Sequence, residues 1–154
     1  MVYSYLKLVH VLFVIIFLGN ITIGFFWKMF AEKTKDPDKI AFAFKGIIKA
    51  DRFFTLPGVI GITLFEIAGA MHGGLPILGT GWILCSIILF SISGVAFMAK
   101  LVPLQKKLAA LASDKEKFNW DEYHKLAKQW DLWGYIALIT PWLAVILMVI
   151  KPNI

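Results

Sequence analysis

The chain has 154 residues, of which 59% are hydrophobic and 17% are charged, and its mean hydropathy is +0.75. About a quarter of the residues in average soluble domains are charged, so a soluble fold of this size would have to hide too much apolar surface. The net charge of +6 does not indicate nucleic-acid binding, because the basic residues lie beside hydrophobic segments, where anionic lipid headgroups are the nearer partner.

Four apolar segments follow one another along the chain, and each is about 18 to 20 residues long. At about 1.5 Å per residue, a helix of that length covers the roughly 30 Å hydrocarbon core of a bilayer. Only Glu66 places a formal charge inside any of the segments. The sequence therefore predicts an all-α integral membrane four-helix bundle, one domain over residues 1–154. The predicted spans are 8–27, 53–71, 82–99 and 132–150.

The first segment, 8–27, is expected to stay in the mature protein as a span. Lys7 is the only basic residue before it, the apolar run is longer than the core of a usual signal peptide, and no small-x-small cleavage site follows.

Lysine and arginine positions predict how the spans are oriented. The connections 28–52 and 100–129 each hold seven of these residues, whereas the turn 72–81 holds none. By the positive-inside rule both basic connections face the cytoplasm and both termini face outward, which is the orientation expected in a cytoplasmic (inner) membrane. Anionic headgroups are then the lipid partner on the cytoplasmic side. The tryptophans expected to anchor the span ends are Trp27, Trp82, Trp130 and Trp133.

Both basic connections are predicted to be helical extensions. In the first, residues 36–38 offer a helix start, and apolar residues then recur at helical spacing opposite lysines, which is typical of an amphipathic helix on the inner leaflet or of a docking surface for a partner. In the second, the third span continues past Pro103, and a new helix starts at Asn119 with Glu122 completing a capping box.

His10 is the first candidate functional residue, because it lies inside the first span. A polar side chain in a span is costly and usually faces the bundle interior. A neutral imidazole there is the usual protein ligand for haem iron or a metal. The alternative is a histidine that bonds to a backbone carbonyl or to a lipid headgroup.

Glu66 is the second candidate, as a lone carboxylate near the middle of the second span. It adjoins a helix face that carries three glycines (58, 61 and 69), and such faces usually meet another span. The carboxylate could act as a proton relay, as a metal ligand, or in a structural hydrogen bond to Asn20 or to the serines at 91 and 93.

The sequence holds two further histidines, His72 and His124. His72 ends the second span in the leaflet predicted for His10, so the two rings could approach and hold a haem or, with Glu66, a transition metal. The alternative for His72 is an exposed turn residue. His124 is expected to be solvated.

Other chemistry is not indicated by the sequence. It holds no nucleotide-binding glycine pattern, no HExxH, no nucleophile elbow and no Ser/His/Asp set, which disfavours hydrolases and kinases. The single Cys85 is expected to be a packing residue. Asp51 with Arg52, and Asp131, are interpreted as interfacial charge pairs.

Several short motifs occur in order along nearly the whole chain. They are Leu6-Lys7-Leu8-Val9-His10, Gly19-Asn20, Trp27-Lys28, Ala50-Asp51-Arg52 through Pro57-Gly58-Val59, Trp130, Trp133-Gly134 and Lys151-Pro152. In this order they resemble a bacterial family of predicted integral membrane proteins, domain of unknown function 2269 (DUF2269).

That family is similar in turn to two four-helix groups whose first span carries a Lys-x-x-His motif. They are the copper-resistance D-type membrane domain and the membrane protoporphyrinogen oxidase that binds haem. The resemblance implies a haem or copper ligand at His10, with Lys7 at the first position of the motif. The oxidase pattern has a tryptophan and a glycine after the histidine, where this chain has residues 17–20 as Phe-Leu-Gly-Asn. This departure speaks against porphyrinogen oxidation and leaves haem binding in place.

We therefore expect a membrane protein with a redox or haem-handling role that binds b-type haem through His10; if it is an enzyme, it is a membrane oxidoreductase. His72 or Glu66 would be the second ligand or a proton acceptor, and Asn20 and Lys7 would complete the site. Copper or another transition-metal ion, held by His10, His72 and Glu66, is the alternative cofactor. Two other classes stay open: a small-solute or metal-ion carrier with Glu66 at its midplane site, and a non-catalytic subunit. A homodimer and a membrane redox partner are the expected protein partners.

Overall fold

The computed structural model describes residues 1–74, 76–77 and 79–153, and it is built from helices. In chain order they are α1 (Val2–Lys33), α2 (Pro37–Ala50), η1 (Asp51–Thr55), α3 (Leu56–His72), α4 (Gly81–Ala96), η2 (Phe97–Leu101), α5 (Val102–Ser113) and α6 (Trp120–Ile150). The segments η1 and η2 are single π-helical turns inside longer rods.

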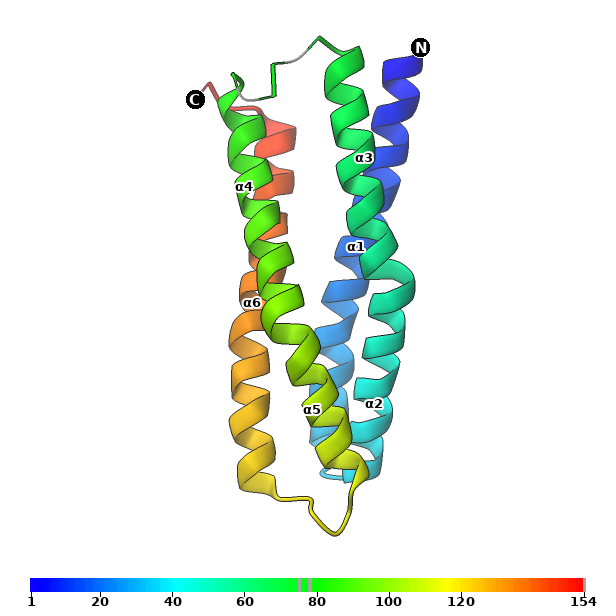
Figure 1. Cartoon of the computed structure of the whole chain (residues 1–154), viewed down its shortest axis with the longest axis vertical. Coiled ribbons are helices and arrows are strands. Elements are labelled where there is room, and N and C mark those ends of the chain that lie inside the picture. The colour runs from blue at the N-terminus through cyan, green and yellow to red at the C-terminus, as the bar shows by residue number, and fades with distance from the viewer. Residues whose placement is uncertain (75, 78, 154) are drawn as a thin grey trace.

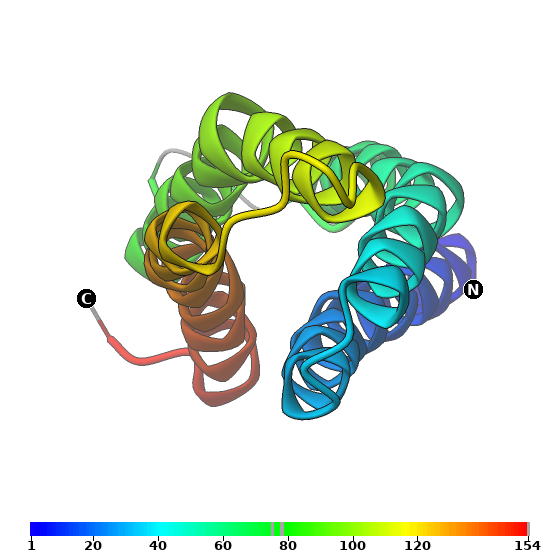
Figure 2. The same cartoon turned by 90° about the horizontal axis from the view of Figure 1, so that it is seen from below.

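These helices form four long rods: α1, then α2 with η1 and α3, then α4 with η2 and α5, and finally α6. All four are long and apolar enough to cross a membrane, which confirms the predicted four-helix bundle. In Figure 1, α1 lies beside α2 and α3, and α6 lies beside α4 and α5. Figure 2, seen from below, shows the rods along an arc with α1 and α6 at its two ends.

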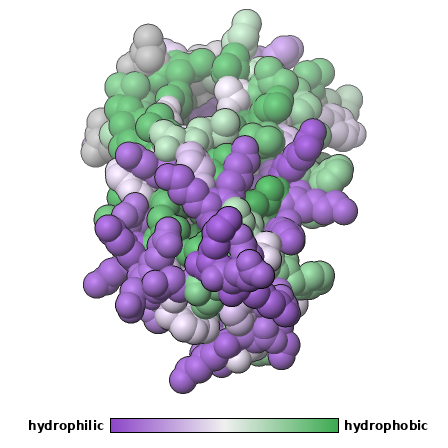
Figure 3. Space-filling view, turned by 60° about the horizontal axis from the view of Figure 1, so that its bottom comes forward, coloured by the Kyte–Doolittle hydropathy of each residue, from purple (hydrophilic) through white to green (hydrophobic). Residues whose placement is uncertain are grey.

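The two ends of the bundle differ in chemistry. Both chain termini lie at one end, here called the terminal end (Figure 1). The α1–α2 turn and the α5–α6 connection lie at the other, the basic end, where Figure 3 shows hydrophilic side chains gathered below a hydrophobic region. The helix α1 has 32 residues and is therefore about 48 Å long, against roughly 30 Å of bilayer hydrocarbon. The predicted helical extensions are thus present as continuations of the rods.

The two helix starts predicted in the basic connections are confirmed. The Asp36 carboxylate accepts a hydrogen bond from the backbone N–H of Asp38 at 3.0 Å and caps α2. The Asn119 side chain accepts one from the backbone N–H of Asp121 at 2.8 Å and caps α6. Both caps satisfy backbone donors that the first turn of a helix leaves free.

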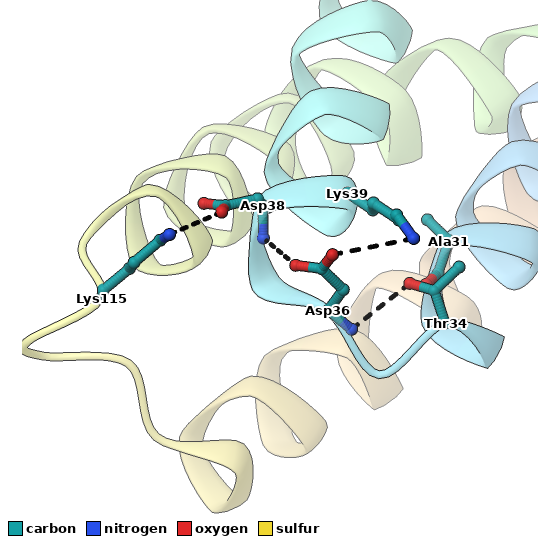
Figure 4. A network of polar contacts seen from close by, with 6 residues as sticks. All are labelled: Ala31, Thr34, Asp36, Asp38, Lys39 and Lys115. Carbon is teal, nitrogen blue, oxygen red and sulfur yellow. Dashed lines mark hydrogen bonds and ion pairs between the residues drawn. The ribbon is translucent and has the colours of Figure 1, made fainter.

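Polar contacts at the basic end link the start of α2 to the α1–α2 turn and to the α5–α6 connection (Figure 4). The ammonium of Lys115, from the α5–α6 connection, lies 2.6 Å from the Asp38 carboxylate of α2. This carboxylate raises the pKa of the Lys115 ammonium. Lys39 pairs with Asp36 at 3.8 Å on the other side of the turn. Since these groups are largely exposed, each pair contributes little to stability.

Each of the two central rods contains its π turn just before a proline. Pro57 follows η1 and Pro103 follows η2, each after one intervening residue. Proline has no N–H and its ring clashes with the carbonyl four residues earlier, so an α-helix cannot run unchanged through these positions. In η1 this turn places Asp51 and Thr55 inside the bundle, with 7% and 0% of their surface exposed.

The largest part of the core lies at the basic end. Ile40 and Phe44 of α2 are 0% and 1% exposed, and they pack against α5 in one cluster with Leu104 and Leu108. The prediction that this amphipathic helix lies on the inner leaflet is therefore wrong. Its apolar face is covered by α5, and the helix continues directly into the second span.

Trp130 also differs from its predicted place at the membrane interface. Only 3% of its surface is exposed, and its ring centroid lies 4.8 Å from that of Phe25 and 5.9 Å from that of Phe44. It is a core residue, because α6 continues past the expected span end and is packed on both sides there. Trp27, with 52% exposed, has the accessibility expected of an anchor.

In the terminal half, α1 packs closely on α3 at two glycines. A Cβ added at Gly61 would lie 2.4 Å from the Phe13 ring, and one at Gly58 would lie 3.1 Å from the Phe17 Cβ. The small-residue face predicted on the second span therefore does meet another helix, since only glycine permits this approach.

The helices α4 and α6 form a second pair, linked by serine hydroxyls. Ser93 Oγ donates to the carbonyl of Ala137 at 2.6 Å, and Ser86 Oγ donates to that of Ala144 at 3.3 Å. The α1–α3 pair and the α4–α6 pair thus stand opposite each other in the terminal half, and they are joined where α2 packs on α5.

Candidate functional site

A small cavity lies between the two helix pairs, and we call it the His10 cavity. Its volume is about 40 Å³. It is lined by His10, Val14, Phe17, Leu18, Ile62, Glu66, Ser86, Phe90, Pro141, Ala144, Val145 and Met148. His10 of the first span and Glu66 of the second span, the two main candidates from the sequence, thus line one cavity.

The ring of His10 is held in a fixed orientation by α3. Its Nδ1 lies 3.1 Å from the carbonyl oxygen of Ile62. Because a carbonyl only accepts hydrogen bonds, Nδ1 carries the proton, and Nε2 is left with a free lone pair. Histidines that bind metals commonly donate their other ring N–H to a carbonyl in this way. The ring is therefore arranged as a ligating histidine requires.

The carboxylate of Glu66 lacks a partner. Glu66 follows Ile62 by one helical turn, so it lies on the side of α3 that holds the His10 ring. Its Oε1 is buried and has no hydrogen-bond partner among the residues that the structure describes. Buried polar atoms are rarely left without a hydrogen-bond partner. The predicted structural bond of Glu66 to Asn20, Ser91 or Ser93 is not formed. Asn20 and Ser93 bond elsewhere, and Ser91 is exposed.

Met148 of α6 adds a third potential donor that sequence reasoning missed. Its side chain lines the His10 cavity together with His10 and Glu66. A methionine in an apolar span gives no signal of its own, since the thioether packs as an ordinary core group. Only the packing of α6 across the bundle shows that this methionine shares a cavity with a histidine and a carboxylate.

The other sequence candidates lie away from this cavity. His72 is exposed at the end of α3, with Nδ1 3.0 Å from the carbonyl of Ala68 in its own helix. Lys7 is exposed on α1, about one turn before His10. His124 stacks on Trp120 at the basic end, with ring centroids 5.6 Å apart. The structure brings His10 and Glu66 together and does not bring His72 to them.

Asn20 belongs to a separate polar cluster at the π turns. Its Nδ2 donates to Asp51 Oδ1 at 3.0 Å and to Thr55 Oγ1 at 2.9 Å. Gln105 Nε2 donates to the other Asp51 oxygen at 2.9 Å. Asp51 is thus held by neutral donors from α1, η1 and α5, so the interfacial pair predicted with Arg52 is wrong. Arg52 points outward and is exposed.

The sequence and the fold can now be compared with known proteins. Residues 4–152 match the family described as "Predicted integral membrane protein (DUF2269)". The chain belongs to this family. No curated protein and no solved structure matches it. Membership of DUF2269 confirms an integral membrane protein and the resemblance to this family, whereas the likeness to the copper-resistance and oxidase groups stays a prediction.

The His10 cavity of this DUF2269 chain is small for an organic cofactor. Sites that enclose larger organic ligands have volumes of about 300 to 1,000 Å³, against about 40 Å³ here. A porphyrin is larger than the space that is open between the helix pairs as they are packed, whereas a water or two fits there. In the described part of the chain no three His, Cys, Asp or Glu side chains gather into a metal site.

Proposed function

We propose that the protein binds one copper ion in the His10 cavity, within the membrane. His10 Nε2, the Glu66 carboxylate and the Met148 thioether would be its ligands. The observation that carries this proposal is that these three side chains, from three helices, line one small cavity, with the imidazole fixed by Ile62 and Glu66 Oε1 without a partner.

The donor set favours copper over other transition metals. Thioether ligands select Cu(I), whereas imidazole suits zinc, copper, iron and nickel. Copper is the metal that both of these donors favour. The carboxylate would balance the charge of the ion, which an apolar bundle cannot otherwise accommodate. Copper was the alternative to haem in the sequence interpretation, and the cavity volume favours it.

A competition titration tests this function. Purified protein in detergent micelles is titrated with Cu(I), kept reduced by ascorbate, against a coloured Cu(I) chelator. We expect about one bound equivalent per chain. We expect His10→Ala and Met148→Leu to lower the affinity on the order of 10- to 100-fold, the range found even for outer-shell partners of metal ligands. Glu66→Gln, which keeps the shape of the side chain, should lower it as well.

Two histidines outside the cavity provide matched controls. His72→Ala and His124→Ala should bind copper as the wild type does, because neither side chain lines the cavity. Unchanged copper affinity in His10→Ala would contradict the proposal. An intense haem absorption band in the purified protein that is lost in His10→Ala would replace copper with haem.

A carrier role is the second candidate, and the proline in the cavity wall favours it. The cavity lies between two helix pairs that are joined at the basic half, and buried Pro141 forms part of its wall. Helices bend at prolines, and helix breaks form the binding sites of many transporters. Copper uptake into proteoliposomes that is abolished in His10→Ala would support transport, whereas binding without uptake would indicate a static site.

The basic end is proposed to face the cytoplasm of a bacterial inner membrane. Its two connections hold 14 of the 16 lysine and arginine residues, and the positive-inside rule counts these residues near span ends. In this orientation the His10 cavity lies in the outer leaflet, so the site would exchange copper with the outside of the cell.

A further inference from the structure

A second, larger cavity lies between α1 and α2 toward the basic end, and we call it the Asn20 cavity. Its volume is about 390 Å³, which falls within the range of small-molecule sites. It is lined along α1 from Asn20 to Thr34, a distance of about 21 Å at 1.5 Å per residue. It is separate from the His10 cavity, with which it shares no lining residue.

We propose that the Asn20 cavity binds a membrane-soluble phenol or alcohol, with its apolar body between α1 and α2 and its hydroxyl donating to the amide oxygen of Asn20. This is a second binding site, independent of copper binding. The aromatic walls of the cavity, its polar groups and its unfilled volume each support this class of ligand.

The walls of the cavity suit a flat apolar ligand. Aromatic rings from three rods line it, with Phe25 and Trp27 on α1, Phe97 on η2 and Trp130 on α6. Aromatic rings favour offset-stacked or edge-to-face contacts with another ring. An aromatic ring or an apolar ring system is therefore the body that these walls fit best.

The polar groups at the Asn20 end mainly accept hydrogen bonds. Asn20 Nδ2 uses its two hydrogens on Asp51 and Thr55, which leaves the amide oxygen of Asn20 as its free group. The Asp51 carboxylate is an acceptor on both oxygens, and its present donors are neutral. A ligand group that donates a hydrogen bond therefore matches most of the polar atoms at this end.

The opposite end of the cavity also carries polar side chains. Lys39 and Thr34 line the cavity there, and Figure 4 shows Lys39 extending toward Ala31 and Thr34. The Thr34 hydroxyl already donates to the carbonyl of Ala31 at 2.7 Å. A neutral hydroxyl is less costly to bury between these apolar walls than an ammonium is. A phenol or alcohol thus fits better than an amine.

Small residues keep the cavity open. Gly24 and Ala43 face it from α1 and α2, and Gly46 lines it with nothing within 4 Å of where its Cβ would be. Small residues in membrane helices usually allow close packing, but here they border unfilled space. A side chain added at Gly46 would therefore meet no clash at its Cβ, at a position that lines the cavity.

The test compares two probes that differ in one hydrogen-bond donor. 2-Naphthol and 2-methoxynaphthalene have the same ring system, but only the naphthol carries an O–H. Each is titrated by calorimetry into protein in lipid nanodiscs, with empty nanodiscs as the reference. We expect about one 2-naphthol per chain, bound at least about 10-fold more tightly than the ether, since a site built around a hydroxyl rejects the analogue that lacks it.

The variant Gly46→Leu should lose 2-naphthol binding at least about 10-fold, because the leucine fills the cavity. Gly19→Leu is its matched control: Gly19 is likewise exposed and has nothing within 4 Å, but it does not line the cavity. Equal binding of the two probes would overturn the proposal, and so would full binding by folded Gly46→Leu. Should Gly46→Leu fail to fold, the probe comparison on the wild type decides alone.

Discussion

Lys28→Met is expected to destabilise the bundle by about 3 kcal/mol. The Lys28 ammonium lies 2.6 Å from Asp131 of α6 and 3.0 Å from Glu32 of α1, and only 4% of the residue is exposed. It links the first and last rods, and it also lies 5.6 Å from the centroid of the Trp130 ring. Removing the cation leaves two carboxylates unpaired, which costs more than the pair itself contributes. Unfolding by SDS in mixed micelles, followed by circular dichroism, measures the loss.

The expected loss lies at the low end of the range for breaking a buried ion pair, which is about 3 to 5 kcal/mol. The reason is that the carboxylates are partly hydrated, with 29% and 38% of the Glu32 and Asp131 side chains exposed. Lys28→Met/Asp131→Leu should recover part of the stability, since it removes one of the unpaired charges as well. Lys33→Met changes an exposed lysine of the same helix and should stay within about 0.5 kcal/mol of the wild type. A loss in Lys28→Met no larger than in Lys33→Met would show that this ion pair does not hold α1 to α6.

Asp51→Leu is expected to cost about 3 kcal/mol or more. Asp51 accepts hydrogen bonds from Asn20 at 3.0 Å, Thr55 at 2.7 Å and Gln105 at 2.9 Å. Thr55 and Gln105 are 0% and 3% exposed, so their donors would be left without a partner and away from water. Each such group costs about 1 to 3 kcal/mol. The same SDS titration measures the effect.

Two matched variants identify the cause of this loss. Asp51→Asn keeps the shape and one carbonyl acceptor, so it should lose clearly less stability than Asp51→Leu. Arg52→Leu changes the exposed neighbour and should be close to neutral. If Asp51→Leu were as stable as the wild type, the three hydrogen bonds at the π turns would make no net contribution, and the cluster could not be described as the link between α1 and the central rods.

Much of the fold could be predicted from the sequence, because a bilayer permits few solutions. A run such as 8–27 must form a helix to satisfy its backbone, and the same holds for the other three spans. The helix starts at residues 36–38 and at Asn119 were also predictable, since local capping chemistry determines them. The glycines at 58 and 61 indicated correctly which face of the second span meets another helix.

The errors lie where one sequence pattern has two physical solutions. The apolar face of α2, with Ile40 and Phe44, could rest on lipid or on protein, and periodicity does not distinguish them. Trp130 at a span end could be an interface anchor or a core residue, and the extension of α6 beyond the bilayer makes it a core residue. Asp51 was predicted to form an ion pair with its neighbour Arg52. The π turn η1 instead directs the Asp51 side chain into the bundle, and a hydropathy pattern does not reveal a π turn.

The candidate site was predictable only in part. His10 and Glu66 were visible as polar groups inside spans, which are costly unless they have a role or a partner. Their meeting in one cavity depends on how the helix pairs pack, and so does the arrival of Met148 from α6. His72 was a candidate only because its predicted depth in the membrane matches that of His10. In the structure its ring bonds to a carbonyl of its own helix.

X-ray absorption at the copper edge tests the central claim most directly. It is recorded on the wild-type protein, on Met148→Leu and on His10→Ala, each loaded with copper. The account predicts imidazole and sulfur scattering around the ion in the wild type, with the sulfur contribution absent in Met148→Leu and the imidazole contribution absent in His10→Ala. Copper surrounded by oxygen alone in the wild type, or the same spectrum in all three proteins, would contradict a copper site in the His10 cavity.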